Sequence, residues 1–301
     1  MSSAVWCSIV IPTYNYARFV GRAIDSALEQ PGPTREVIVV DDGSTDHTPD
    51  VLAAYGDRIR AIRQTNQGVS AARNAGIAAA RGDYIVCLDA DDRLLPDGLT
   101  RLKAAADANP QAAMVFGAYQ TVDERGHVRR ASPPPRMSTP LRNFYRFLLR
   151  EFTIGNGRAA MRRELFDRIR YPVGLTHGED IVVFGQILAN YPVVSLADCV
   201  AESYEHPSRA RNNLSALLRN GAATIDALFC PALLPPPALA WRPVFAAVWY
   251  AELARGAFKA GDHRQARALY HTALRTYWPV LVRGWHLTRW LRTYWPVRRA
   301  A

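Results

Sequence analysis

The chain has 301 residues, of which 49% are hydrophobic and 21% are charged, and its formal net charge is +10. These proportions are typical of a globular protein with a sizeable core and exclude a low-complexity or disordered chain. The positive charge indicates an anionic partner such as phosphate groups or an acidic glycan, but no recognisable motif supports binding to nucleic acid.

The cysteines and the apolar runs favour a cytoplasmic protein. The four cysteines lie far apart and have no zinc-site spacing. Cys7 and Cys87 fall in apolar runs, so we expect buried, reduced thiols. The N-terminus lacks the pattern of a signal peptide. No apolar stretch reaches roughly 18 residues, so we expect no transmembrane helix.

Residues 1–92 alternate short apolar runs with helical patterns. Strands are expected at 8–11, 36–40, 59–63 and 84–88, and helices at 19–30, 49–55 and 69–81. Strands that are apolar throughout and alternate with helices predict a parallel sheet covered on both faces.

Polar residues gather where these strands end. Ligands of open α/β sheets bind outside the carboxyl ends of the strands, so one shared site is expected. Asp89, Asp91 and Asp92 lie within four positions and repel one another unless a cation lies between them. Mg²⁺ or Mn²⁺ bound to substrate phosphates would neutralise them. The alternative is that these acids only cap a helix or make a turn.

After Asp92 the elements are more varied. Helices are expected at 97–108 and 181–188, a strand at 112–119, a strand and a short helix within 154–169, and a strand region at 193–204. The basic, proline-rich segment 125–140 is expected to be a mobile loop. A boundary is expected near residue 210, followed by a helical region broken by prolines.

Two features stand out in the helical region. Residues 251–279 predict two helices around Gly261-Asp262, similar to a tetratricopeptide-type hairpin, which we expect to pack on the main domain. Residues 278–301 carry four of the seven tryptophans, five arginines and no acidic residue. A helix of this composition either lies at a membrane interface or packs its tryptophans on the protein.

Four segments in order carry a resemblance to a known family. They are SIVIPTYNYARFVGRAIDSALEQ, EVIVVDDGSTDHT, NQGVSAARNAGIAAARGDYIVCLDADD and HGED. Together they resemble glycosyltransferase family 2, whose members are inverting enzymes with the GT-A fold, and the resemblance covers about residues 7–206. No GxGxxG follows the first strand, which counts against a dinucleotide-dependent dehydrogenase.

The resemblance implies an α/β fold of the GT-A (nucleotide-diphospho-sugar transferase) type, with a mostly parallel central sheet and a C-terminal helical extension. The GT-A domain would be 1–210, with a nucleotide-binding half at 1–110 and an acceptor half at 111–210. The helical region would be 211–301.

The resemblance also implies roles on the donor side. In the family the turn after the first strand holds the nucleotide base, and an acid after the second strand reads the base edge. Two acids of a DXD motif face the ribose and the metal. The matching residues are Pro12, Thr13 and Tyr14 for the base, Asp42 for its edge, Asp89 for the ribose and Asp91 for the metal.

Two further donor-side residues have alternatives. Arg73 matches a position that faces ribose or phosphate, although an arginine on a helix is often only solvated. His206 would touch the diphosphate or complete the shell of an Mn²⁺ or Mg²⁺ cofactor, or would simply be packed.

On the acceptor side, Asp180 matches the general base and Glu179 a residue that orients the acceptor. An acceptor hydroxyl is a poor nucleophile, and a positioned carboxylate can remove its proton as the new bond forms. The alternative is that both acids only favour a helix N-terminus through the helix dipole.

These inferences predict a metal-dependent inverting glycosyltransferase of the hexosyltransferase type. It would move a sugar from a nucleotide sugar, expected to be a UDP-sugar, to a glycan or lipid-linked acceptor in cell-surface polysaccharide or lipopolysaccharide synthesis. It would be cytoplasmic, and peripheral on the inner face of the membrane if the last helix contacts lipid. A non-catalytic sugar-nucleotide-binding module and a nucleotidyltransferase remain alternatives.

Overall fold

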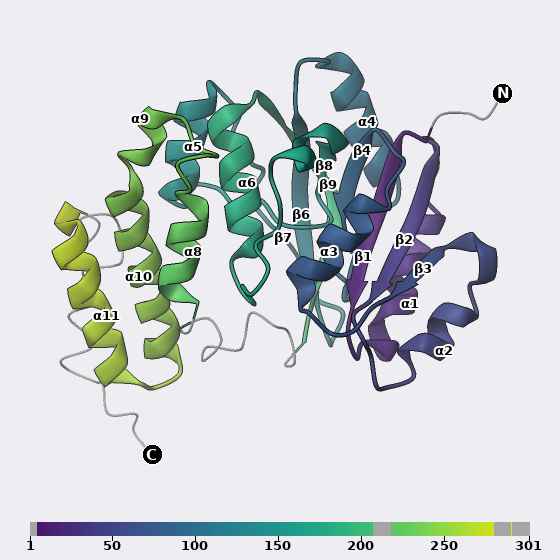
Figure 1. Ribbon diagram of the computed structural model, residues 1–301, viewed down its shortest axis with the longest axis horizontal. Coiled ribbons are helices and arrows are strands. Elements are labelled where there is room, and N and C mark those ends of the chain that lie inside the picture. The colour runs from purple at the N-terminus through teal and green to yellow at the C-terminus, as the bar shows by residue number, and fades with distance from the viewer. Residues whose placement is uncertain (1–4, 207–217, 219, 280–289, 291–301) are drawn as a thin grey trace.

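The computed structural model describes residues 5–206, 218, 220–279 and 290. A twisted sheet with helices on both faces is followed by a bundle of helices at one end (Figure 1). The strands are β1 (Cys7–Thr13), β2 (Arg35–Asp41), β3 (Arg60–Arg63), β4 (Tyr84–Cys87), β5 (Asp92–Leu94), β6 (Met114–Asp123), β7 (Val128–Arg130), β8 (Ala159–Arg162) and β9 (Val193–Glu205). The helices are α1 (Ala17–Leu28), α2 (Thr48–Ala53), α3 (Val69–Ala78), α4 (Gly98–Ala108), α5 (Pro140–Leu148), α6 (Glu179–Asn190), α8 (Gly221–Leu228), α9 (Pro236–Leu239), α10 (Arg242–Lys259) and α11 (His263–Thr276). Two 3₁₀ helices span Gly56–Arg58 and Arg163–Asp167.

The sheet has the order β3-β2-β1-β4-β8-β6-β9-β5, and β7 pairs with β6. The pairs β2–β3, β1–β2 and β1–β4 are parallel, as expected for the first half of the chain. In the second half β8 lies antiparallel between β4 and β6, while β9 runs parallel to β6. The parallel half therefore presents the carboxyl ends of β1, β2 and β4 on one edge.

Strand β1 is buried on both faces, which explains its continuous apolar run. Ile9 and Ile11 belong to the core beneath α1 and α4, whereas Val10 belongs to the opposite core with Ile77 of α3. A Cβ on Gly76 would lie 2.4 Å from Cγ1 of Val10, so the glycine allows α3 to approach β1 closely. This approach places the first turns of α3 beside the polar strand ends.

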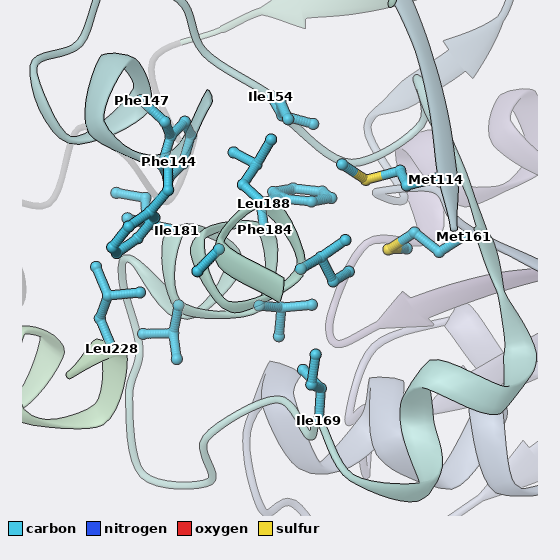
Figure 2. Close-up of a cluster of buried hydrophobic side chains, with 14 of the residues drawn as sticks. Met114, Phe144, Phe147, Ile154, Met161, Ile169, Ile181, Phe184, Leu188 and Leu228 are labelled. Atoms are coloured by element: carbon cyan, nitrogen blue, oxygen red, sulfur yellow. The ribbon is translucent and has the colours of Figure 1, made fainter. Parts of the chain in front are cut away.

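Helix α6 is apolar almost all round because other elements surround it. Figure 2 shows its side chains between phenylalanines of α5, a leucine of α8 and methionines of the sheet. The labelled residues from these four groups are Ile181, Phe184 and Leu188; Phe144 and Phe147; Leu228; and Met114 and Met161. The helical region thus packs on the main domain, as the sequence predicts, and fixes the position of α6.

The C-terminal hairpin also confirms its prediction. Helices α10 and α11 meet at Gly261, which has a φ of 84°, and the Asp262 side chain accepts a hydrogen bond of 2.9 Å from the Gln265 N–H. The expected boundary near residue 210 lies outside the described residues, and so does the tryptophan- and arginine-rich segment 278–301 apart from Trp278, Pro279 and Trp290. None of the helices that the structure describes is both long and apolar enough to cross a bilayer.

Strands β5 and β7 and helix α5 are additions to the predicted elements. The segment 125–140, expected to be a mobile loop, contains β7, which pairs with residues 120–122 of β6. Residues 131–139 form no helix or strand, as a loop requires, but β7 was not expected because it is a three-residue exposed edge strand, and edge strands tolerate the charged residues that suggest a loop.

Candidate active site

Three carboxylates gather where β4 ends and β5 begins. One oxygen from each of Asp89, Asp91 and Asp92 can be chosen so that all lie within 4.8 Å of one another. We call these three residues the acidic rim. The expected cluster is present, and different neighbours engage each of its members.

Asp89 is joined to the first turn of α6 through Arg73. The guanidinium of Arg73 donates from Nη2 to Oδ1 of Asp89 at 2.8 Å and from Nη1 to Oε1 of Glu179 at 2.7 Å. Arg73 is only 3% exposed, so it is not the solvated helix residue of the alternative reading. Burial acts to lower the pKa of Arg73, but the carboxylates of Asp89 and Glu179 raise it well above its usual value. The three side chains form an ion triad around a buried guanidinium, with the Asp89 carboxylate partly exposed.

Asp91 contacts His206, and these are the two residues that the resemblance assigns to the metal. The two side chains are 3.0 Å apart between Oδ2 of Asp91 and Nε2 of His206. The ring of Phe19 stacks on His206 with centroids 4.6 Å apart, and Arg22 donates to the Asp91 carbonyl at 2.7 Å. His206 is therefore both packed and in contact with the rim.

Asp92 ties the strands together. Its carboxylate accepts from the Ser203 hydroxyl at 3.1 Å and from the Tyr204 N–H at 3.2 Å, which fastens β5 to β9. Its main contacts are thus within the sheet.

The residues of the rim suit a divalent ion. Carboxylate oxygens are the ligands that Mg²⁺ and Mn²⁺ prefer, and one or two carboxylates with substrate phosphates are usual for Mg²⁺. Because Asp89 binds Arg73 and Asp92 binds β9, Asp91 is the residue that would hold such an ion, with His206 beside it.

The turn after β1 offers polar groups at the same edge. Thr13 lies in register with Asp41 of β2, and the Asp42 N–H donates to the Thr13 carbonyl at 2.9 Å. The Thr13 hydroxyl is buried and has no hydrogen-bond partner among the described residues, while the Tyr14 ring is 45% exposed. Pro12 is buried within β1. An incoming ligand could satisfy the Thr13 hydroxyl.

Asp42 has contacts that its sequence motif does not reveal. Its carboxylate accepts from the Gln64 side chain at 2.7 Å and from the N–H groups of Gln67 and Gly68 at 2.9 and 2.8 Å. It therefore orders the turn that leads into α3, and so supports the placement of Arg73. A carboxylate has about four acceptor sites, so these bonds leave room for a base N–H.

Asp180 lies in the first turn of α6, one residue after Glu179. Burial, with the nearby charges of Glu179 and Asp89, raises its pKa to about 7, although Arg73 acts to lower it. A carboxyl group with a pKa near neutrality is suited to proton transfer at physiological pH. The position at a helix N-terminus and a role as a base are compatible.

Several residues of the site were not predicted. Asn156 donates to Asp89 at 3.2 Å, and the Tyr171 ring lies 5.0 Å from the Arg73 guanidinium carbon. Arg158 follows Asn156 and Gly157, and the sequence Gly155-Asn156-Gly157-Arg158 could have signalled a site because two glycines flank Asn156 and a charged residue follows. The positive φ of Gly157, 80°, favours glycine.

A rim of carboxylates, a buried arginine and a near-neutral carboxyl group together are typical of an enzyme that transfers a group from a phosphate-bearing donor. Residues 8–170 match the family model described as glycosyl transferase family 2. Since this segment is more than half of the 301 residues, the chain belongs to that family, and the predicted resemblance is confirmed.

Curated relatives match parts of the chain. The succinoglycan biosynthesis protein ExoO of Rhizobium meliloti is 52% identical over 103 residues, which are 34% of this chain and 30% of ExoO. The uncharacterized glycosyltransferase EpsJ of Bacillus subtilis is 36% identical over 186 residues, which are 58% of this chain and 52% of EpsJ. The match thus spans about a third of ExoO and about half of EpsJ.

Solved structures match nearly the whole chain. S. aureus TarS has a TM-score of 0.63 at 19% identity, covering 96% of this chain and 54% of TarS. The mannosyltransferase PcManGT of Pyrobaculum calidifontis, solved with GDP-Man and Mn²⁺, has a TM-score of 0.53 at 22% identity. The match covers 96% of this chain and 84% of PcManGT. The fold is therefore the predicted GT-A fold with a C-terminal helical region.

Proposed function

We propose that the protein is a metal-dependent, inverting glycosyltransferase that moves a sugar from a nucleotide sugar to an acceptor hydroxyl. The observation that carries this proposal is the bridge made by Arg73, which binds Asp89 at 2.8 Å and Glu179 at 2.7 Å. One guanidinium thereby holds the acidic rim next to the turn that carries Asp180.

The donor would lie along the edge formed by β1, β2 and β4. Pro12, Thr13 and Tyr14 would contact the nucleotide base, Asp42 would accept from its edge, and Arg73 and Asp89 would face ribose or phosphate. A UDP-sugar is the proposed donor. A fragment of TarS, with a TM-score of 0.59 to this chain, was solved with UDP-GlcNAc, and PcManGT was solved with GDP-Man.

Mn²⁺ or Mg²⁺ would be held by Asp91, with His206 beside it. When bound, such an ion would stabilise the charge that grows on the departing diphosphate. Asp91 and His206 already lie 3.0 Å apart, so little rearrangement is needed.

Asp180 would act as the general base. Its carboxylate takes the proton of the acceptor hydroxyl while the acceptor oxygen bonds to the anomeric carbon. The bond from that carbon to the diphosphate oxygen breaks, and the nucleoside diphosphate leaves with the electron pair. Attack opposite the leaving group inverts the configuration. Glu179 binds Arg73 through Oε1, and its other oxygen would orient the acceptor.

The acceptor would be a glycan or a lipid-linked sugar in cell-surface polysaccharide or lipopolysaccharide synthesis, on the cytoplasmic side. The name of ExoO, a succinoglycan biosynthesis protein, supports this setting.

A thermal-shift panel tests the proposal. UDP, GDP, dTDP and CDP are each added with and without Mn²⁺, and the matching sugar nucleotide is then followed for release of nucleoside diphosphate. We expect one nucleotide to raise the melting temperature more with Mn²⁺ than without it. Release of pyrophosphate from a nucleoside triphosphate would instead indicate a nucleotidyltransferase, and binding without any turnover would indicate a binding module.

The rate of transfer is expected to depend on pH through Asp180. A base must be deprotonated to act, and burial with the adjacent carboxylates raises the pKa of Asp180 to about 7. At pH 6 only about a tenth of the molecules would carry the ionised form, so kcat should rise roughly fivefold between pH 6 and pH 7 and level off above pH 8. A kcat that stays constant across this range would contradict the assignment.

A further inference from the structure

Asp89 is the most accessible carboxylate of the acidic rim, and two side chains hold it through a single oxygen. Oδ1 of Asp89 accepts from Nη2 of Arg73 at 2.8 Å and from Nδ2 of Asn156 at 3.2 Å. The Asp89 side chain is 31% exposed, whereas Asp91 and Asp92 are buried. Its other oxygen, Oδ2, accepts no hydrogen bond from any residue that the structure describes. The protein therefore fixes one oxygen of Asp89 and leaves the other for a ligand.

Asn156 is itself held on its other side by Tyr171. The Tyr171 hydroxyl donates to Oδ1 of Asn156 at 3.3 Å and also contacts the Cys87 thiol. An ionised carboxylate can only accept, so the Asn156 amide must turn its NH₂ group toward Asp89 and its oxygen toward the tyrosine. Tyr171 is 1% exposed, and burial raises the pKa of its hydroxyl well above the usual value. The hydroxyl therefore keeps the proton that it donates.

The backbone of Tyr171 is fixed to α3. Asn74 donates from Nδ2 to the Tyr171 carbonyl at 2.8 Å and accepts from the Tyr171 N–H at 3.0 Å. Asn74 directly follows Arg73 in α3, and the guanidinium carbon of Arg73 lies 5.0 Å from the centre of the Tyr171 ring. The contacts therefore form a closed ring that leaves α3 at Arg73 and returns to it at Asn74.

The backbone next to Asn156 allows this close contact with the rim. Gly157 has a φ of 80°, and its N–H donates to the Cys87 carbonyl at the end of β4. A Cβ on Gly157 would lie 3.0 Å from Cδ1 of Leu88, so the glycine lets the loop approach the residue that precedes Asp89. Asn156 is thus placed by the backbone as well as by its side-chain contacts.

We propose that Asn156 is a positioning residue that holds Asp89 so that its second carboxylate oxygen accepts a hydrogen bond from a ribose hydroxyl of the nucleotide donor. Tyr171 in turn holds Asn156. This inference rests on the proposed function, in which Asp89 faces the donor. A side chain that is already ordered loses less conformational entropy when it binds a ligand, so the contact is stronger. Because the amide is neutral, it orients Asp89 and adds no charge to the acidic rim.

The test measures how strongly the protein prefers a ribose to a deoxyribose. UDP, or the nucleoside diphosphate that binds best, is titrated by calorimetry into the full chain at saturating Mn²⁺, alongside its 2′-deoxy and 3′-deoxy forms. We expect the wild type to bind the ribose form about tenfold more tightly than at least one deoxy form, because a hydrogen bond to a charged group is lost. Asn156→Ala should reduce this preference about three- to tenfold and leave the affinity for that deoxy form unchanged. A general loss of structure would instead weaken the binding of all forms.

Tyr171→Phe removes the hydroxyl, keeps the ring beside Arg73, and should reduce the preference by a smaller factor. Since both changes act on the same contact, the double variant Asn156→Ala/Tyr171→Phe should show the same preference as Asn156→Ala alone. Asn109→Ala is the matched control. Asn109 is a half-buried asparagine at the end of α4 that donates to the Ala105 carbonyl at 2.9 Å, and its variant should keep the full preference.

The results separate this inference from the function on which it rests. If no nucleotide binds to the wild type, the proposed function fails. If a nucleotide binds but the wild type does not prefer the ribose form, or Asn156→Ala keeps the preference, the positioning role is overturned. Should Asn156→Ala fail to fold, Tyr171→Phe decides, because a reduced preference supports the role and an unchanged one overturns it. Additive effects in the double variant would overturn the part assigned to Tyr171.

Discussion

Replacing Asp180 with asparagine is expected to lower the rate of sugar transfer by about 10²- to 10⁴-fold, the usual contribution of a general base. Asparagine has nearly the same shape but cannot take a proton. The affinity for the nucleotide should stay within about twofold of the wild type, because it is Glu179, not Asp180, that binds Arg73 beside the acidic rim. Transfer rates under single-turnover conditions, with calorimetry for the nucleotide, measure the two quantities.

The Asp180→Asn variant should fold without loss of stability at pH 8. The pKa of Asp180 is raised in the folded protein to about 7 from an unfolded value of 3.8. The folded state therefore binds more protons between these values, and the free energy of unfolding falls as pH rises through this window. Asparagine removes that unfavourable charge. Asp198→Asn, at an exposed acid paired with Arg101, is the matched control and should keep full activity. Transfer that survives in Asp180→Asn would remove Asp180 as the base.

Replacing Arg73 with methionine is expected to destabilise the fold by about 3–5 kcal/mol, because it leaves two carboxylates close together without their cation. Asp89 and Glu179 both bind Arg73, which is 3% exposed; solvent reaches part of the Asp89 carboxylate but little of the Glu179 carboxylate. Loss of the cation also favours the protonated form of Asp180, whose pKa Arg73 acts to lower. The midpoint of urea unfolding at pH 8 measures the effect.

Arg73→Lys provides the control for this prediction. Lysine keeps the charge, but its single ammonium group cannot replace the two guanidinium nitrogens that donate to Glu179 and Asp89. An intermediate loss of stability is therefore expected. Arg142→Met removes an exposed arginine of α5 and should change the free energy of unfolding by less than about 0.5 kcal/mol. Equal stability of Arg73→Met and the wild type would mean that the triad does not hold the two halves of the site together.

Local sequence patterns were enough to predict most of the sheet and the donor-side cluster. The apolar runs of β1, β2 and β4 and the acids at their ends are short-range features, and parallel strands necessarily bring their carboxyl ends to one edge. Strand β5 escaped prediction because its three residues, Asp92 to Leu94, pair only with β9, more than 100 positions away.

The connections within the site could not be read from the sequence for the same reason. Arg73 and Glu179 are 106 positions apart, and only the tertiary fold brings them together. A motif identifies Glu179 and Asp180 as acids before a helix but does not reveal that one holds an arginine while the other has its pKa raised by burial.

We propose coupling of the acidic rim to the donor diphosphate by a divalent ion at Asp91. This coupling is tested by calorimetric titration of UDP, or of whichever nucleoside diphosphate the panel selects, into wild type and Asp91→Asn with and without Mn²⁺. We expect Mn²⁺ to tighten binding to the wild type at least tenfold and to have little effect on the variant. Equal tightening in both proteins, or none in the wild type, would contradict it.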